Sequence, residues 1–124
     1  MKKILFETHH LYYLPNFIPI IEALRSKGGY DIYVSMPQYM QERERELCYG
    51  ACSSMGIQVI NADLEVTRIE EIKSANFDVI VVGNVGQLRK IVSESTIAVM
   101  VYHGIGLKQS YYNDIDQRID IRAV

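Results

Sequence analysis

The sequence contains no tryptophan, only two cysteines and three prolines, and no excess of basic residues. Thirteen lysines and arginines stand against fifteen aspartates and glutamates, so the formal net charge is −2 at pH 7. Binding to nucleic acid or to an anionic membrane surface favours a basic patch, and this balance supports neither. We therefore expect no nucleic-acid partner.

Long apolar runs are also scarce near the start of the chain. The apolar run that follows Lys2 and Lys3 ends at Glu7, too early for the core of a secretion signal or for a membrane span. We therefore expect a cytoplasmic protein.

The two cysteines, Cys48 and Cys52, are four residues apart, so on a helix they lie along one face. A zinc site needs more ligands close by, and the neighbouring sequence does not supply them. We expect two buried free thiols, no metal site and no cofactor.

The chain alternates strand-like apolar runs with helix-like stretches. Strands are expected at Lys3–Thr8, Tyr30–Met36, Gly56–Asn61, Phe77–Gly83 and Thr96–Tyr102. Strands that alternate with helices predict a parallel sheet covered on both faces. The expected fold is a single α/β domain over residues 1–124, a Rossmann-like, doubly wound parallel sheet with the first, fourth and fifth strands central.

Three local signals indicate where the intervening helices begin. A helix from Phe17 would carry Pro19 in its first turn and end at Gly28, and Pro37 would open a long helix to about Met55. Thr67 stands three residues before a glutamate, which is capping-box spacing for a third helix. A fourth helix is expected around residues 88–92.

The end of the chain, from Arg118 to Val124, has the composition of another strand and no polar tail. Domains usually finish in surface segments of low structure. We therefore expect this chain to be a piece of a longer protein.

Ligands of open parallel α/β sheets bind at the carboxyl ends of the strands. The loops expected there are residues 9–16, 83–86 and 103–113, and together they hold all three histidines, several tyrosines and four of the eight glycines. This concentration predicts a functional edge that includes His9, His10 and Gly83.

The loop after the fifth strand reads His103-Gly-Ile-Gly-Leu-Lys108. A dinucleotide fingerprint would need a third glycine, and P-loop spacing is missing throughout. Backbone amides at Gly104 and Gly106 could approach an anion, with Lys108 adding positive charge and His103 an imidazole that titrates near neutral pH. A purely structural turn, with His103 bonded to a carbonyl and Lys108 solvated, stays open as the alternative.

Two segments resemble the CDP-glycerol glycerophosphotransferase family, which makes teichoic-acid-type polymers. Residues 8–22, THHLYYLPNFIPIIE, are similar to the opening strand, loop and helix of such transferases, and residues 102–108, YHGIGLK, are similar to the family's Trp-His-Gly-Thr-x-x-Lys block. Tyr102 replaces the tryptophan and Ile105 the threonine, whereas the His-Gly pair and the lysine spacing are kept.

The resemblance implies the amino-terminal, acceptor-side domain of a GT-B architecture, with the nucleotide-binding carboxyl-terminal domain absent from this chain. It implies a transferase of cell-wall polymer synthesis that takes CDP-glycerol or another CDP-activated alcohol or sugar nucleotide as donor and a polymer or lipid-linked acceptor. His103 would be the catalytic base, Gly104, Gly106 and Lys108 would stabilise the phosphoryl group, and His9, His10, Tyr12 and Tyr13 would line the acceptor side. The full-length protein would work in the cytoplasm with peripheral contact to the inner face of the membrane, and this chain alone would be inactive.

Two other classes of function remain open. One is a GT-B sugar-nucleotide glycosyltransferase or epimerase, and the other is a non-catalytic Rossmann-like binding module.

Overall fold

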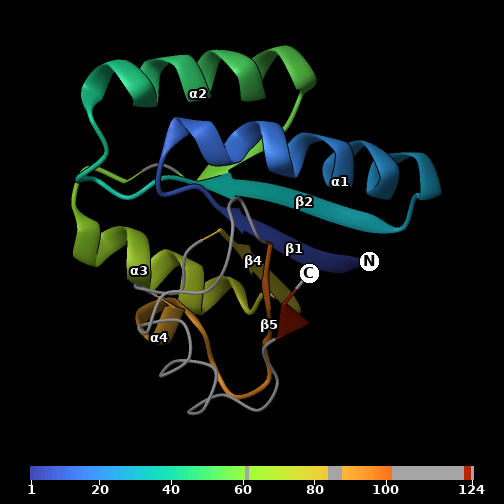
Figure 1. The fold of residues 1–124 in the computed structure, drawn as a ribbon. Coiled ribbons are helices and arrows are strands. Elements are labelled where there is room, and N and C mark those ends of the chain that lie inside the picture. The colour runs from blue at the N-terminus through green and yellow to red at the C-terminus, as the bar shows by residue number, and fades with distance from the viewer. Residues whose placement is uncertain (61, 84–87, 102–121, 124) are drawn as a thin grey trace.

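The computed structural model describes residues 1–60, 62–83, 88–101 and 122–123 (Figure 1). Its centre is a sheet of six strands in the order β3-β2-β1-β4-β5-β6, and every neighbouring pair is parallel. The strands are β1 Lys2–Glu7, β2 Tyr30–Ser35, β3 Gln58–Ile60, β4 Val79–Val82, β5 Ile97–Met100 and β6 Arg122–Ala123. The predicted α/β, Rossmann-like class is confirmed, and the first, fourth and fifth strands all lie inside the sheet.

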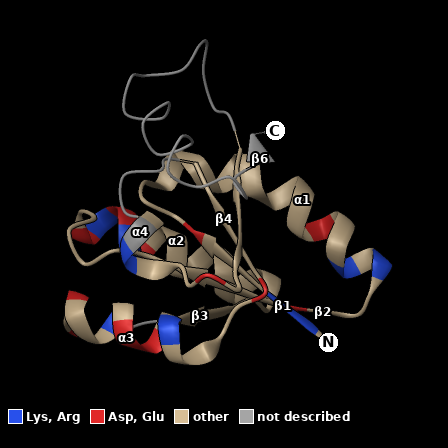
Figure 2. Ribbon diagram, turned by 90° about the horizontal axis from the view of Figure 1, so that it is seen from below, with Lys and Arg blue, Asp and Glu red and all other residues tan. Residues whose placement is uncertain are grey.

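Helices cover both faces of this sheet. On one face lie α1 Leu14–Lys27 and α2 Glu42–Met55, and on the other lie α3 Glu65–Ala75 and α4 Leu88–Ile91 (Figure 1). A short 3-10 turn, η1 Leu11–Tyr13, leads from β1 into α1. Lys, Arg, Asp and Glu are intermixed along the helices (Figure 2). None of the described helices combines the length and the apolar character needed to cross a membrane.

Strand β1 shows why the central strands are apolar almost throughout. Ile4 and Phe6 pack into the core beneath α1 and α2, whereas Leu5 packs into the core that α3 and α4 cover. A strand buried on both faces loses the alternation of polar and apolar residues. Ile4 lies opposite Ile32 of β2 and opposite Val79 of β4, so β1 anchors both halves of the sheet.

The predicted starts of three helices are wrong by several residues. Helix α1 begins at Leu14, with Pro15 in its first turn and Pro19 inside the helix. Leu14, Phe17 and Ile21 are buried, and this packing outweighs the backbone hydrogen bond that Pro19 cannot donate.

Helices α2 and α3 also begin elsewhere than their local signals indicate. Residues 37–41 form turns, so Pro37 does not open α2, which starts at Glu42 and continues through Gly50. Helix α3 starts at Glu65, which places Thr67 inside its first turn instead of at the cap. The Glu65 carboxylate accepts a hydrogen bond from the backbone N–H of Gln38, a tertiary contact that the local sequence does not reveal.

The cysteine prediction is confirmed. Cys48 and Cys52 are free, buried and on the inner face of α2. Helix α2 ends where Gly56 takes a left-handed conformation, with φ at 67°, and its N–H bonds back to the last turn.

Candidate functional site at the carboxyl edge of the sheet

The strand order reverses between β1 and β4, and this reversal defines the candidate site. Helix α1 follows β1 on one face of the sheet, whereas α4 follows β4 on the other. The carboxyl ends of two such strands leave room for a ligand between their loops. Here those ends lead into Thr8, His9 and His10 after β1 and into Gly83 after β4.

A buried ion pair underlies this edge. The guanidinium of Arg68, on α3, donates from one terminal nitrogen to both carboxylate oxygens of Glu7, at 2.7 and 2.9 Å, and both residues are 0% exposed. The hydroxyl of Ser35 donates to Oε2 of Glu7 at 2.8 Å. The other guanidinium nitrogens of Arg68 donate to Glu65. Strands β1 and β2 and helix α3 are thereby joined through one polar cluster.

The ion pairs keep these groups charged in spite of their burial. Burial by itself lowers the pKa of Arg68, but the hydrogen bonds to Glu65 and the charge of Glu7 outweigh it, so the pKa is raised. Burial likewise raises the pKa of Glu65, and the hydrogen bonds from Arg68 and from the backbone of Gln38 outweigh it, so the pKa is lowered. The cluster therefore places two carboxylates, Glu7 and Glu65, in ion pairs with the single guanidinium of Arg68.

The sequence prediction missed Glu7, Ser35, Glu65 and Arg68 as parts of this edge. A signal for two of them was present, because Glu7 ends an apolar strand and Arg68 shares a helix face with the buried Ile72, where a charge is unexpected.

His9 and Thr8 are buried beside this cluster without partners of their own. His9 is 4% exposed and Thr8 is 0% exposed. Three of their side-chain atoms have no hydrogen-bond partner among the described residues: the two ring nitrogens of His9 and the hydroxyl oxygen of Thr8. Buried polar atoms are nearly always bonded in folded proteins, so these three atoms indicate a place for a polar ligand.

The imidazole of His9 is neutral at physiological pH. Burial lowers its pKa from 6.5, and the positive charges of Arg68 and His10 act in the same direction, against the opposing carboxylates of Glu7 and Glu65. A neutral imidazole offers one N–H donor and one nitrogen acceptor.

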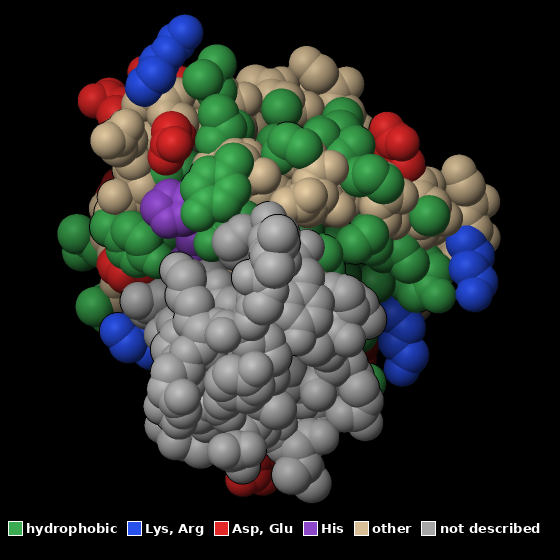
Figure 3. Space-filling view, in the orientation of Figure 1, with side chains coloured by type: hydrophobic (Ala, Val, Ile, Leu, Met, Phe, Trp, Pro, Cys, Tyr) green, Lys and Arg blue, Asp and Glu red, His purple; other side chains and the backbone are tan. Residues whose placement is uncertain are grey.

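Aromatic rings surround the two histidines. The rings of His10 and Tyr12 are stacked, with centroids 5.2 Å apart and planes at 6°, and Tyr12 is 55% exposed. Tyr39, from the turn after β2, lies with its ring centroid 6.5 Å from that of His9 and is 56% exposed. Burial and the charge of Glu7 raise the pKa of the Tyr39 hydroxyl to about 12. Histidine and hydrophobic side chains come to the surface side by side here (Figure 3).

Tyr13 is buried at the reversal of strand order and connects the loops of β1 and β4. Its ring lies 6.4 Å from the ring of His9 and 5.7 Å from the ring of His10, centroid to centroid. A Cβ placed on Gly83 would come within 3.0 Å of this same ring. The missing side chain of Gly83 thus makes room for Tyr13.

The structure therefore brings His9, His10, Tyr12, Tyr13 and Gly83 together at one edge, and their predicted role in binding stays a prediction. His103, Gly104, Gly106 and Lys108 lie outside the described residues. Within the described ranges, no three His, Cys, Asp or Glu side chains form a group that could hold a metal ion.

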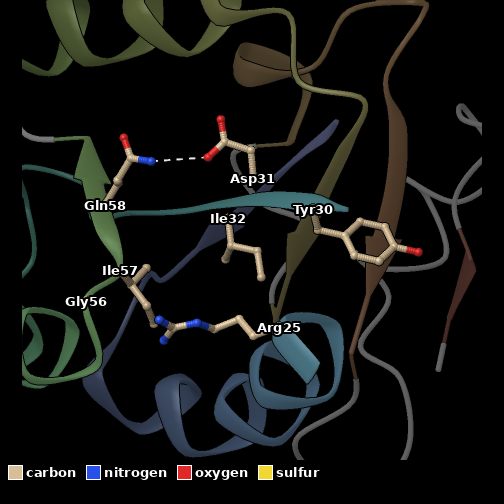
Figure 4. Close-up of a pocket in the computed structure, with 7 residues that line it drawn as sticks. All are labelled: Arg25, Tyr30, Asp31, Ile32, Gly56, Ile57 and Gln58. Atoms are coloured by element: carbon tan, nitrogen blue, oxygen red, sulfur yellow. Dashed lines mark hydrogen bonds between the residues drawn. The ribbon is translucent and has the colours of Figure 1, made fainter. Parts of the chain in front are cut away.

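A pocket of about 160 Å³ lies at the opposite, amino-terminal end of strands β2 and β3 (Figure 4). Asp31 and Gln58 are bonded to each other there at 3.2 Å, and the guanidinium of Arg25 donates to the carbonyl of Met55 in the last turn of α2. Arg25 thus satisfies a carbonyl at the end of α2, whereas Asp31 and Gln58 bond to each other between β2 and β3.

Comparisons with protein-family models, with curated proteins and with solved structures found no match.

Proposed function

We propose that this domain is the acceptor-side half of a GT-B transferase that moves glycerol phosphate from CDP-glycerol to a polymer hydroxyl in teichoic-acid-type cell-wall synthesis. The observation that carries the proposal is the buried pair of His9 and Thr8 at the reversal of strand order, whose polar side-chain atoms have no hydrogen-bond partner in the part of the chain that the structure describes. A ligand with polar groups is needed there to complete their hydrogen bonds.

The resemblance of residues 8–22 and 102–108 to the glycerophosphotransferase family supplies the reaction class. In that reaction an acceptor hydroxyl attacks the β-phosphorus of the donor and CMP leaves. We assign the role of base to His103, which would accept the hydroxyl proton. Lys108 and the amides of Gly104 and Gly106 would stabilise the charge that spreads over the phosphoryl oxygens.

The proposal is tested by titrating the isotope-labelled chain with a short glycerol phosphate oligomer and following backbone amide shifts by NMR. We expect saturable shifts at Thr8, His9 and Gly83, and none at Asp31 and Gln58 on the opposite edge. We also expect no release of CMP when CDP-glycerol is added, because the donor would bind mainly to the other half of the transferase.

Three results would count against the proposal. The oligomer could fail to bind, its shifts could fall on the opposite edge, or the chain alone could release CMP at a substantial rate. Saturable binding of a sugar nucleotide at the same edge, with no binding of the oligomer, would favour a glycosyltransferase or epimerase instead.

A further inference from the structure

We infer that His9 and Thr8 form the subsite for a neutral hydroxyl group at the end of the acceptor, and that this subsite rejects a phosphate group. The inference rests on the proposed function and specifies which part of the acceptor meets the end of β1. It follows from the charges around His9 and from the hydrogen bonds that its ring can make.

The first argument is the charge beside the subsite. Arg68 is buried, and each of its three guanidinium nitrogens already donates to Glu7 or Glu65. The three groups together leave one uncompensated negative charge. A phosphate placed against His9 would be repelled by that charge in a poorly solvated environment.

The described charged side chains of the neighbouring elements do not reverse this balance. Helix α2 packs against η1, and its residues 42–46 carry three glutamates and two arginines. Lys90 is exposed on α4, and α4 covers the face of the sheet opposite to the face that Tyr13 occupies. Its positive charge therefore does not offset the negative charge beside His9.

The second argument is hydrogen-bond complementarity. The neutral imidazole of His9 offers one donor and one acceptor, and the hydroxyl of Thr8 can serve as either. A ligand hydroxyl both donates and accepts, so it can donate to the unprotonated ring nitrogen of His9 while it accepts a hydrogen bond from the hydroxyl of Thr8. An ionised phosphate oxygen only accepts and would leave the unprotonated nitrogen of His9 without a partner.

Access to the subsite requires a covering side chain to move. Tyr39 is the suitable candidate among the described neighbours, because its ring is about half exposed and lies on the turn of residues 36–41 instead of on a helix or strand.

The test compares two ligands and three variants of the chain. The ligands are a glycerol phosphate oligomer that ends in a free glycerol hydroxyl and the same oligomer with that end closed by a phosphate monoester. We expect the phosphate-terminated oligomer to bind at least about tenfold more weakly, and inorganic phosphate to leave the ring signals of His9 unshifted.

The variant His9→Phe keeps a planar ring but removes both nitrogens. We expect it to weaken binding of the hydroxyl-terminated oligomer about tenfold while the melting temperature stays the same or rises, because a buried polar group without a partner is lost. His9→Gln keeps a donor and an acceptor and should retain more of the affinity than His9→Phe. Gln58→Ala, on the opposite edge, is the matched control and should bind as the unmodified chain does.

Each remaining outcome overturns the inference. If the phosphate-terminated oligomer binds as well or better, or if folded His9→Phe keeps full affinity, the hydroxyl subsite is wrong and the proposed function stands. A lowered melting temperature of His9→Phe with unchanged affinity would give His9 a purely structural role. If neither oligomer binds, the proposed function and the subsite fail together.

Discussion

Glu7 and His9 lie two residues apart at the end of β1, and both are buried polar residues. They differ in whether their polar atoms have hydrogen-bond partners. Both carboxylate oxygens of Glu7 are bonded, to Arg68 and to Ser35, so its charge is compensated. His9, in contrast, has a polar ring whose two nitrogens find no hydrogen-bond partner within residues 1–60, 62–83, 88–101 and 122–123. Burying an unbonded polar group costs about 1–3 kcal/mol. His9 therefore lowers the free energy of unfolding of the domain.

The first residue-scale prediction concerns pH. The folded-state pKa of His9 is depressed below 6.5, mainly by burial, so the unfolded chain binds the proton more readily. The stability linked to His9 is therefore fully present above pH 6.5 and is lost as the pH falls toward the folded-state pKa. Glu7 and Glu65, which oppose this shift, and Arg68 and His10, which add to it, are present in both proteins compared below.

Melting temperatures of the unmodified chain and of His9→Phe, measured between about pH 8 and about pH 5.5, check this prediction. We expect the unmodified chain to lose more stability on acidification than His9→Phe, since the other histidines are present in both proteins. Equal losses in the two proteins would mean that His9 binds its proton as readily in the folded chain as in the unfolded chain, which contradicts a lowered pKa.

At the scale of elements, the end of β4 and the loop after β1 fit together through one ring and one missing side chain. Tyr13 occupies the space in which Gly83 would carry a Cβ. By contrast, Gly50 lies inside α2 with open space where its side chain would be. The same substitution should therefore have opposite effects at these two glycines.

We expect Gly83→Ala to destabilise the domain by about 1–3 kcal/mol, because the added methyl group overpacks against Tyr13. We expect Gly50→Ala to stabilise it by roughly 0.5–1 kcal/mol, because alanine is the better helix former. Urea denaturation of both variants measures the difference. A neutral Gly83→Ala would show that the Tyr13 ring shifts without cost.

At the scale of the whole molecule, the ion pair between Glu7 and Arg68 joins segments 61 residues apart in sequence. It connects the central strand to α3, and Ser35 extends the connection to β2. Because the pair is desolvated, each charge depends on the presence of the other.

We expect Arg68→Leu to lower the free energy of unfolding by about 3–5 kcal/mol, because it leaves Glu7 charged, buried and without its cation. The double variant Glu7→Leu with Arg68→Leu should be more stable than Arg68→Leu alone. Denaturant unfolding of the two single variants and the double variant gives the coupling energy. Additive losses would show that the two side chains do not interact strongly.

Several features of this domain follow from the sequence alone. The alternation of strand-like and helix-like runs and the apolar character of the strands expected at Phe77–Gly83 and Thr96–Tyr102 predicted a parallel sheet covered on both faces, because hydrophobic periodicity is a local property of a segment. The rule that ligands bind at the carboxyl ends of parallel strands was sufficient to group His9, His10 and Gly83.

Other features were decided only by the tertiary structure. Helix α3 begins at Glu65, whose side chain bonds to Gln38 and Arg68, and α1 accommodates Pro19 because its inner face is buried. A local helix-start signal such as an N-cap contributes only about 1 kcal/mol. Tertiary contacts of this kind can therefore shift the residue at which a helix begins.

The polar cluster beneath the candidate site also depends on the fold. Nothing in the local sequence pairs Glu7 with Arg68 or places Tyr13 over Gly83, because each contact joins residues brought together only when β1, β4 and α3 pack. The sequence determined which residues stand at the strand ends. The packing of the strands and helices decided that Glu7 is paired there with Arg68 and that both ring nitrogens of His9 lack a hydrogen-bond partner among the described residues, since burial and long-range partners are properties of the folded chain.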